Sequence, residues 1–280
     1  MTRMIDLHVH TTASDGTFTP SDVVLLAKKA GLAAMAVTDH DTISGVEEAV
    51  NKAKEVDLEL VPGVEISVGD TEDVHIIGLY IDYKDTKLLK VMDTLSNYRK
   101  TRNEEMILNI RKEGFDITYE AIEKLMNTNN IGRLHIAYYM QKMGMVSDYR
   151  KVFKKYLIPG TKTYVPMKKL SEEKGINAIL QSGGIPVLAH INYLKQSDAD
   201  IEKTVRGLMG YGLKGIEVFY SGYDKRIEKL AYRISEKYNL IKSGGTDFHG
   251  ARRPGVYLGT GRGNLCVPYE FLVDIKKKLG

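Results

Sequence analysis

The sequence of 280 residues contains one cysteine, Cys266, and no tryptophan. A single cysteine excludes an intrachain disulfide and a zinc site built from several thiolates, so we expect Cys266 to be a small packed apolar side chain. The sequence also lacks an apolar run of the roughly 20 residues that span a bilayer, and its first residues do not resemble a signal peptide. We therefore expect a cytoplasmic protein that does not bind membranes.

Charge is distributed unevenly along the chain, although the net charge is only +4. Residues 84–169 contain 18 Lys and Arg against 9 Asp and Glu, whereas the rest contains 22 against 27. Many of these lysines are expected on solvated helix faces. The asymmetry of the whole segment nevertheless indicates a basic part that attracts an anion and an acidic part that can hold cations.

Seven short apolar and β-branched segments alternate with helical patterns, which is typical of parallel βαβ units in a barrel or a doubly wound sheet. The first helix is well marked, because Thr19 can cap it, Pro20 suits its first turn and Gly31 ends it. The predicted strands are at residues 5–10, 34–39, 58–66, 74–81, 185–190, 215–219 and 240–243.

The alternation stops between residues 84 and 168, where a long helix is predicted at 87–112 and shorter ones at 119–126, 131–143 and 149–156. We expect a basic helical insertion at 84–168 that covers the active site. Residues 1–83 and 169–280 then form the barrel.

Histidines and carboxylates gather near the ends of the predicted strands. His8 and His10 are two residues apart on one strand, so both side chains lie on the same face, and Asp247 and His249 repeat this spacing. One such residue alone is usually just hydrogen-bonded. Because the carboxyl ends of parallel barrel strands share one face, the joint pattern predicts a metal centre. It also includes His40, Glu65, His75 and His190.

The chain resembles the PHP (polymerase and histidinol phosphatase) superfamily at six motifs. They are DLHVHTTASDG at residues 6–16, AVTDHD at 36–41, GVEIS at 63–67, HIIGL at 75–79, AH at 189–190 and GTDFHG at 245–250. The pattern is most similar to small bacterial phosphatases of that superfamily. The resemblance implies an α/β fold, a distorted seven-stranded (βα) TIM-like barrel with a helical insertion.

The resemblance also implies three divalent ions held by nine residues. The first ion would have His8, His10, Glu65 and Asp247, the second Glu65 (bridging), His75 and His190, and the third Asp15, His40 and His249. Nitrogen and carboxylate ligands without thiolate suit Mn²⁺, which we expect, with Zn²⁺ and Fe²⁺ as alternatives. A hydroxide activated by the ions would attack phosphorus, and His190 or His249 would protonate the leaving oxygen.

The insertion contains GRLH at residues 132–135, which resembles a Gly-Arg-Pro-His element of the phosphatases. A lone arginine is usually a surface residue, but the resemblance implies that Arg133 contacts phosphate through its planar fork. We also predict substrate contacts for His135, Lys162 and Tyr164, and a catalytic role for Asp247 and Arg133. Asp39 and Asp41 flank His40, and we expect one of them to orient a metal-binding imidazole. The alternative for Asp41 is that it caps a helix at 42–53.

The predicted function is hydrolysis of phosphomonoesters of nucleotides. The substrates would be 3′,5′-bisphosphate nucleotides, nucleoside 5′-monophosphates or short 5′-phosphorylated RNA. Two alternatives stay open: a histidinol-phosphate phosphatase, and a non-catalytic module that binds metal or nucleic acid. The presence of all nine ligand positions argues against the second. We expect a phosphorylated small molecule or oligonucleotide as partner and no obligate protein partner.

Overall fold

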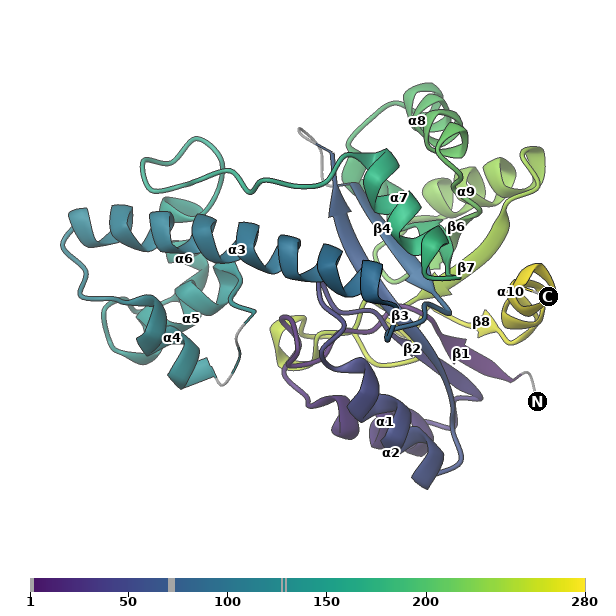
Figure 1. The fold of residues 1–280 in the computed structure, drawn as a ribbon, viewed down its shortest axis with the longest axis horizontal. Coiled ribbons are helices and arrows are strands. Elements are labelled where there is room, and N and C mark those ends of the chain that lie inside the picture. Colours follow the sequence, from purple (N-terminus) through teal and green to yellow (C-terminus); the bar gives the residue numbers. More distant parts are fainter. Residues whose placement is uncertain (1–2, 70–73, 127, 129, 280) are drawn as a thin grey trace.

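The computed structural model describes residues 3–69, 74–126, 128 and 130–279. Eight strands form one sheet in the order β7-β6-β5-β4-β3-β2-β1-β8 (Figure 1). The strands are β1 (Met4–Asp6), β2 (Ala34–Val37), β3 (Glu59–Val68), β4 (Val74–Leu79), β5 (Ile185–Leu188), β6 (Gly215–Tyr220), β7 (Ile241–Gly245) and β8 (Val267–Pro268).

The sheet curves into a nearly closed barrel because the chain after β1 meets β7. The N–H of Leu7 donates to the carbonyl of Gly244 at 3.1 Å, and Val9 forms a parallel bridge with Phe248. A Cβ on Gly245 would lie 2.4 Å from the Cβ of His8, so glycine is needed for this approach. The α/β barrel predicted from the sequence is therefore confirmed.

Strand β4 runs antiparallel to both neighbours, β3 and β5, whereas β1–β2, β2–β3, β5–β6 and β6–β7 are parallel. The alternation of strands and helices in the sequence had predicted parallel units. The reversal brings the amino end of β4, not its carboxyl end, to the edge where the parallel strands end. His75, the second residue of β4, thereby reaches the same edge as the other predicted ligands.

The barrel has one strand more than predicted. β8 contains only two residues, one of them proline, and pairs antiparallel with Met4 and Ile5 of β1. So short a segment has no periodic pattern, which is why the sequence analysis missed it. The adjacent Cys266 is exposed, so the expectation that it is packed was wrong.

Helices α1 (Pro20–Lys29), α2 (Val46–Glu55), α7 (Glu172–Gln181), α8 (Asp198–Gly210), α9 (Lys225–Lys237) and α10 (Glu270–Leu279) accompany the strands, with short 3₁₀ helices η1 (Ile191–Leu194) and η2 (Gly250–Arg252). As predicted, Thr19 caps α1 and accepts the N–H of Asp22 at 3.1 Å. In the described part of the chain, every helix is too short or too polar to cross a membrane.

Four helices follow β4: α3 (Thr86–Lys112), α4 (Tyr119–Met126), α5 (Arg133–Lys142) and α6 (Tyr149–Tyr156). In Figure 1, α3 begins beside the barrel and projects away from it, and the other three gather around its outer half. Leu88 and Leu95 of α3 belong to the barrel core, whereas Met106 and Ile110 pack in a second core with α4, α5 and α6. One continuous helix therefore connects two hydrophobic cores.

Candidate metal centre

All nine predicted ligand side chains converge at one edge of the barrel. Four groups have ligand atoms within 4.8 Å of one another: His10, Asp15, His40 and His249; His8, His10 and Glu65; His8, His190 and Asp247; and His40, Glu65 and His75. Ligand atoms about 2.1 Å from one ion are at most about 4.2 Å apart, so this spacing is close to that of coordinated ligands.

Glu65 of β3 lies at the centre of the cluster, and its two oxygens face different histidines. Oε1 lies 2.9 Å from Nδ1 of His75 and 2.8 Å from Nε2 of His190. Oε2 lies 3.3 Å from Nε2 of His8, 3.2 Å from Nε2 of His10 and 2.9 Å from Nδ1 of His40. This division suits a carboxylate that bridges two ions.

Asp247 also divides its oxygens between two environments. Oδ1 lies 3.2 Å from Nε2 of His10 and 3.3 Å from Nδ1 of His249. Oδ2 accepts from the hydroxyl of Tyr220 at 2.8 Å and pairs with Arg253. One oxygen thus faces the cluster while the other is anchored by the protein.

Asp15 supplies the carboxylate of the third predicted group. Its Oδ1 lies 3.1 Å from Nε2 of His249 and 3.9 Å from Nδ1 of His10. The ring centroid of His40 lies 4.4 Å from that of His10. The third group thus shares His10 with the first.

Unsatisfied buried atoms show that a cation fits these residues. Oε2 of Glu65 and Nδ1 of His40 are buried without a hydrogen bond, although they lie only 2.9 Å apart. Nε2 of His8 faces Nε2 of His10 at 3.1 Å. Lone pairs that converge without good hydrogen bonds are stabilised by a cation, and this mixture of nitrogen and oxygen donors suits a divalent transition metal.

The pKa values in the cluster are shifted as expected for ligands held together. Burial opposes ionisation of Glu65, but His40 and His8 hold its pKa well below the usual range. Burial likewise opposes protonation of His8, but Glu217 and Glu65 raise its pKa well above the usual range. Without a bound cation, histidine protons therefore supply the positive charge that the carboxylates require.

Glu217 of β6 contacts two predicted ligand residues and was not among the residues predicted from the sequence. It is fully buried, its Oε1 lies 3.0 Å from Nδ1 of His8, and its Oε2 accepts the N–H of His190 at 2.8 Å. A single carboxylate in the apolar strand GIEVFY was the available signal, because a buried acid requires a partner. Through these two contacts Glu217 orients His8 and His190, although it does not belong to the ligand groups itself.

Asp39 and Asp41, on either side of His40, accept hydrogen bonds from other segments of the chain, and Asp41 also pairs with an arginine. Asp39 accepts the N–H and the hydroxyl of Thr11 at 2.8 and 2.7 Å. Asp41 accepts the N–H of Ser67 at 2.9 Å and pairs with Arg99 of α3. Helix α2 begins at Val46, so the interpretation of Asp41 as its N-cap was wrong.

A cavity of about 230 Å³ opens beside the ligand cluster. Its lining includes two arginines and a tyrosine that were not predicted from the sequence. The available signal was the position of Arg252 and Arg253, three and four residues after the predicted ligand His249. Arg252 donates to the carbonyl of Asp15 at 2.7 Å, and Arg253 pairs with Asp247. The lining residues are Asp15, His40, His75, Leu134, His190, Tyr193, Asp247, His249, Arg252 and Arg253.

The predicted substrate-binding residues lie in different places. His135 is buried next to Arg252, with Nε2 2.8 Å from Nη1, and burial and Arg252 lower its pKa to about 3. Arg133 donates to the carbonyl of Leu157 at 3.2 Å, with its guanidinium 5.8 Å from the ring centre of Tyr164. Arg133, Tyr164 and the exposed Lys162 are not among the described residues that line the cavity.

Comparison with known proteins gives a family model and close relatives. The model of the PHP domain matches residues 6–210. A 5′-3′ exoribonuclease of Haemophilus influenzae is 32% identical over 250 residues, which cover 89% of this chain and 91% of the relative. A 3′,5′-nucleoside bisphosphate phosphatase of Chromobacterium violaceum is 33% identical over 248 residues, or 88% of this chain and 87% of the relative.

The fold is similar to that of a solved structure. A candidate metal-dependent phosphoesterase from Bifidobacterium adolescentis superposes with a TM-score of 0.86. It is 26% identical in sequence, and the match covers 99% of this chain and 96% of that one.

Proposed function

Because this chain belongs to the PHP domain family, we propose that it removes phosphate from nucleotides with the help of bound divalent ions. The relatives are named as enzymes that cleave phosphate esters of nucleotides or RNA, so the chain is a hydrolase of phosphate esters. The substrates we propose are 3′,5′-bisphosphate nucleotides, nucleoside 5′-monophosphates and short 5′-phosphorylated RNA.

The convergence of the nine predicted ligand residues in one cluster, in which Glu65 faces five histidines, is the observation that supports this proposal. We propose the division of ligands into three groups that the sequence predicted, with Mn²⁺ as the activating ion. When bound, such ions supply an activated water and neutralise charge on phosphoryl oxygens.

The chain's own residues prepare the cavity for an anion. Arg252 and Arg253 bring two guanidinium groups to its wall, and Arg is well suited to bidentate contact with phosphate. Tyr193 lines the same wall, and its hydroxyl lies 3.2 Å from Nη2 of Arg253. These side chains would orient the phosphate while the ligand cluster holds the ions.

The insertion at 84–168 would act as a cap that binds the rest of the nucleotide. Its Leu134 already lines the cavity, and its Arg99 pairs with Asp41 beside His40. If the cap binds substrate through Arg133, the Arg133→Ala variant will raise the Michaelis constant for a nucleotide. An unchanged constant would remove Arg133 from the site.

Phosphate release from a panel of substrates tests the proposed function. The metal-stripped protein is reloaded with Mn²⁺ and given adenosine 5′-monophosphate, adenosine 3′,5′-bisphosphate, histidinol phosphate and a 5′-phosphorylated RNA trimer. We expect metal-dependent release from the nucleotides and much less from histidinol phosphate. Release mainly from histidinol phosphate would favour the first alternative. No release from any of them, with metal bound, would favour a binding module.

A further inference from the structure

The peptide bond that follows the predicted ligand His40 is hydrogen-bonded on both sides. Its N–H, which belongs to Asp41, donates to the carbonyl of Glu65 in the barrel at 2.9 Å. Its carbonyl accepts from Nδ2 of Asn130 in the insertion at 3.0 Å. Asn130 is itself buried, with a relative exposure of 7%. The barrel and the insertion therefore fix the plane of this peptide together, and with it the position from which the side chain of His40 projects.

The side chain of Asp41 is divided between the barrel and the insertion in the same way. Its Oδ1 accepts the N–H of Ser67 on β3 at 2.9 Å, whereas its Oδ2 pairs with Arg99 of α3. Asp41 also has a φ of 52°, in the left-handed region that residues other than glycine rarely adopt. Such a conformation persists only where the surroundings hold it, so both contacts help to maintain the turn next to His40.

Helix α3 supports both contacts from one of its faces. Arg99 and Asn103 are four residues apart, so their side chains lie on the same side of the helix. Asn103 is fully buried and donates to the carbonyl of Ile131, the residue after Asn130. The position of Asn130 therefore depends on α3, and the insertion reaches the chain around His40 at two points.

The insertion also contacts the residue that holds Asp15. Arg252 of η2 donates to the carbonyl of Asp15 at 2.7 Å, and Nη1 of Arg252 lies 2.8 Å from Nε2 of His135 on α5. Asp15 and His40 both belong to the third predicted group, and their ligand atoms lie within 4.8 Å of each other. Two of the three ligands of that group are thus adjacent to contacts made by the insertion.

Ligands of the first and second predicted groups are held from within the barrel. Glu217 of β6 contacts Nδ1 of His8 and accepts the N–H of His190. Tyr220, on the same strand, donates to Asp247 at 2.8 Å. One barrel strand therefore supports both groups, whereas the third depends in part on the insertion.

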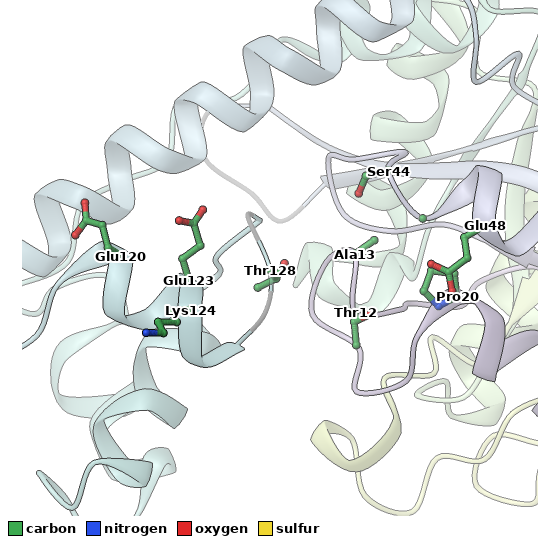
Figure 2. A pocket seen from close by; sticks show the side chains of 10 residues that line it. Thr12, Ala13, Pro20, Ser44, Glu48, Glu120, Glu123, Lys124 and Thr128 are labelled. Atoms are coloured by element: carbon green, nitrogen blue, oxygen red, sulfur yellow. The ribbon is translucent and has the colours of Figure 1, made fainter.

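Beside Asn130, a cavity of about 550 Å³ separates the insertion from the barrel. Figure 2 shows Glu120 and Glu123 of α4 on one side of it and Glu48 on the other. Carboxylates on opposite walls repel each other, so they do not hold the two parts together. Thr128, which accepts the N–H of Asn130 at 3.2 Å, lines the same cavity. Asn130 therefore lies where the contact between the insertion and the barrel ends.

We propose that Asn130 and Arg99 position His40 for the third ion, so that this ion binds tightly only while the insertion is docked on the barrel. Both are positioning residues, because they act through the backbone of His40 and the side chain of Asp41. By linkage, the bound ion should in turn stabilise the docked insertion. The insertion then controls how many ions the site holds. This inference rests on the division into three ligand groups in the proposed function.

Titration of the metal-stripped Asn130→Ala variant with Mn²⁺ tests the inference. The paramagnetic resonance signal of free Mn²⁺ gives the number of bound ions and their affinities without any turnover. We expect the wild type to bind three ions. The variant should bind one of them about 10- to 100-fold more weakly, the usual range when a group that orients a metal ligand is lost. The affinities of the other two ions should be unchanged.

Asn97→Ala is the matched control, because it is the same substitution at an exposed position of α3 in the insertion, and it should bind three ions as the wild type does. Asn103→Leu is a second variant that retains the volume of the side chain but removes the bond to Ile131, and it should weaken the same single ion. Unchanged binding in both Asn130→Ala and Asn103→Leu, an equal loss of all three ions, or a wild type that binds fewer than three would overturn the proposal.

Amide hydrogen exchange of peptides from α4 and α5 measures the reverse effect, that of the ion on the insertion. In the wild type, saturation with Mn²⁺ should increase the protection of these peptides, because the ion holds His40 where Asn130 can donate to it. The increase should be much smaller in Asn130→Ala at the same concentration. Protection that does not respond to Mn²⁺, or responds equally in both proteins, would contradict the coupling.

These binding measurements separate the inference from the proposed function. If Asn130→Ala loses one ion selectively but the wild type hydrolyses no substrate of the panel, the proposed function fails and the role of Asn130 stands. If the wild type hydrolyses nucleotides and Asn130→Ala binds all three ions as tightly as the wild type, the role of Asn130 fails and the function stands.

Discussion

Nδ1 of His8 lies 3.0 Å from Oε1 of Glu217, and both side chains are fully buried. The residues are 209 positions apart in the sequence and meet because β1 and β6 belong to the same barrel. The carboxylate fixes the ring of His8 so that Nε2 faces Glu65. It also accepts the N–H of His190, so one acid positions ligands of two predicted metal groups.

Glu217→Gln should weaken binding of Mn²⁺ by about 10- to 100-fold, as is typical when a group that orients a metal ligand is lost. The amide retains the shape of the side chain but cannot accept from both His8 and His190. Competition with a metal-binding dye measures the affinity, and excess Mn²⁺ should restore most of the turnover. Glu270→Gln, an exposed position on α10, is the control. Wild-type affinity in Glu217→Gln would show that this carboxylate does not position the ligands.

The stabilisation by metal should increase with pH from 6.5 upward. In the metal-free protein, burial lowers the pKa of His40, but Glu65 and Asp15 outweigh it and raise the value to about 10. The folded-state pKa of His40 lies above its unfolded value of 6.5. Protonated His40 therefore stabilises the metal-free fold fully below pH 6.5, and this contribution is lost as the pH approaches 10. A bound ion takes the place of the proton, so its own contribution grows over the same window.

Calorimetric melting with Mn²⁺ and with a chelator, carried out without oxygen, measures this effect. The difference between the two melting temperatures should rise steadily with pH. A difference that does not depend on pH would contradict the replacement of protons by metal.

Loss of Arg99 should destabilise the fold. Arg99→Met leaves Asp41 buried without its cation, and removal of one partner of such a pair costs about 3–5 kcal/mol. Urea unfolding of the metal-free protein measures the change. The double variant Arg99→Met, Asp41→Asn should recover part of the loss, because the uncompensated charge is then absent. Additive losses would mean that the two side chains do not interact.

Local patterns predicted most of the fold and eight of the nine residues that the structure brings together, whereas Asp15 was implied only by the family resemblance. The two-residue spacing of His8 and His10 requires only that both lie on an extended chain, and their Nε2 atoms are in fact 3.1 Å apart. The insertion helices were predicted equally well, since Asp85 caps α3 and Gly114 follows its end. Such features depend on neighbours in the sequence, so the sequence contains them directly.

Other features depend on contacts between distant residues. The direction of β4 is determined by its pairing with β3 and β5, and β8 exists only because β1 offers a free edge at Met4 and Ile5. The roles of Glu217 and Arg253 follow from partners on other strands and loops. Neither residue stands out by its spacing, and only the fold shows what each one touches.

Asp247→Asn should abolish hydrolysis and leave the fold intact. Asp247 has a positive φ of 54°, a conformation that asparagine tolerates at least as well as aspartate, so the backbone can be retained. Activity is lost because the amide removes the negative charge that faces His10 and His249. Arg253, the partner of Asp247, is then left without an anion.

The matched control is Asp57→Asn, an exposed residue with a similar φ of 52° outside the described cavity. Circular dichroism should show both variants folded, and phosphate release with saturating Mn²⁺ should separate them. Full activity in folded Asp247→Asn would remove this carboxylate from the metal centre. The remaining oxygen and nitrogen donors around Glu65 would then have to hold the ions without it.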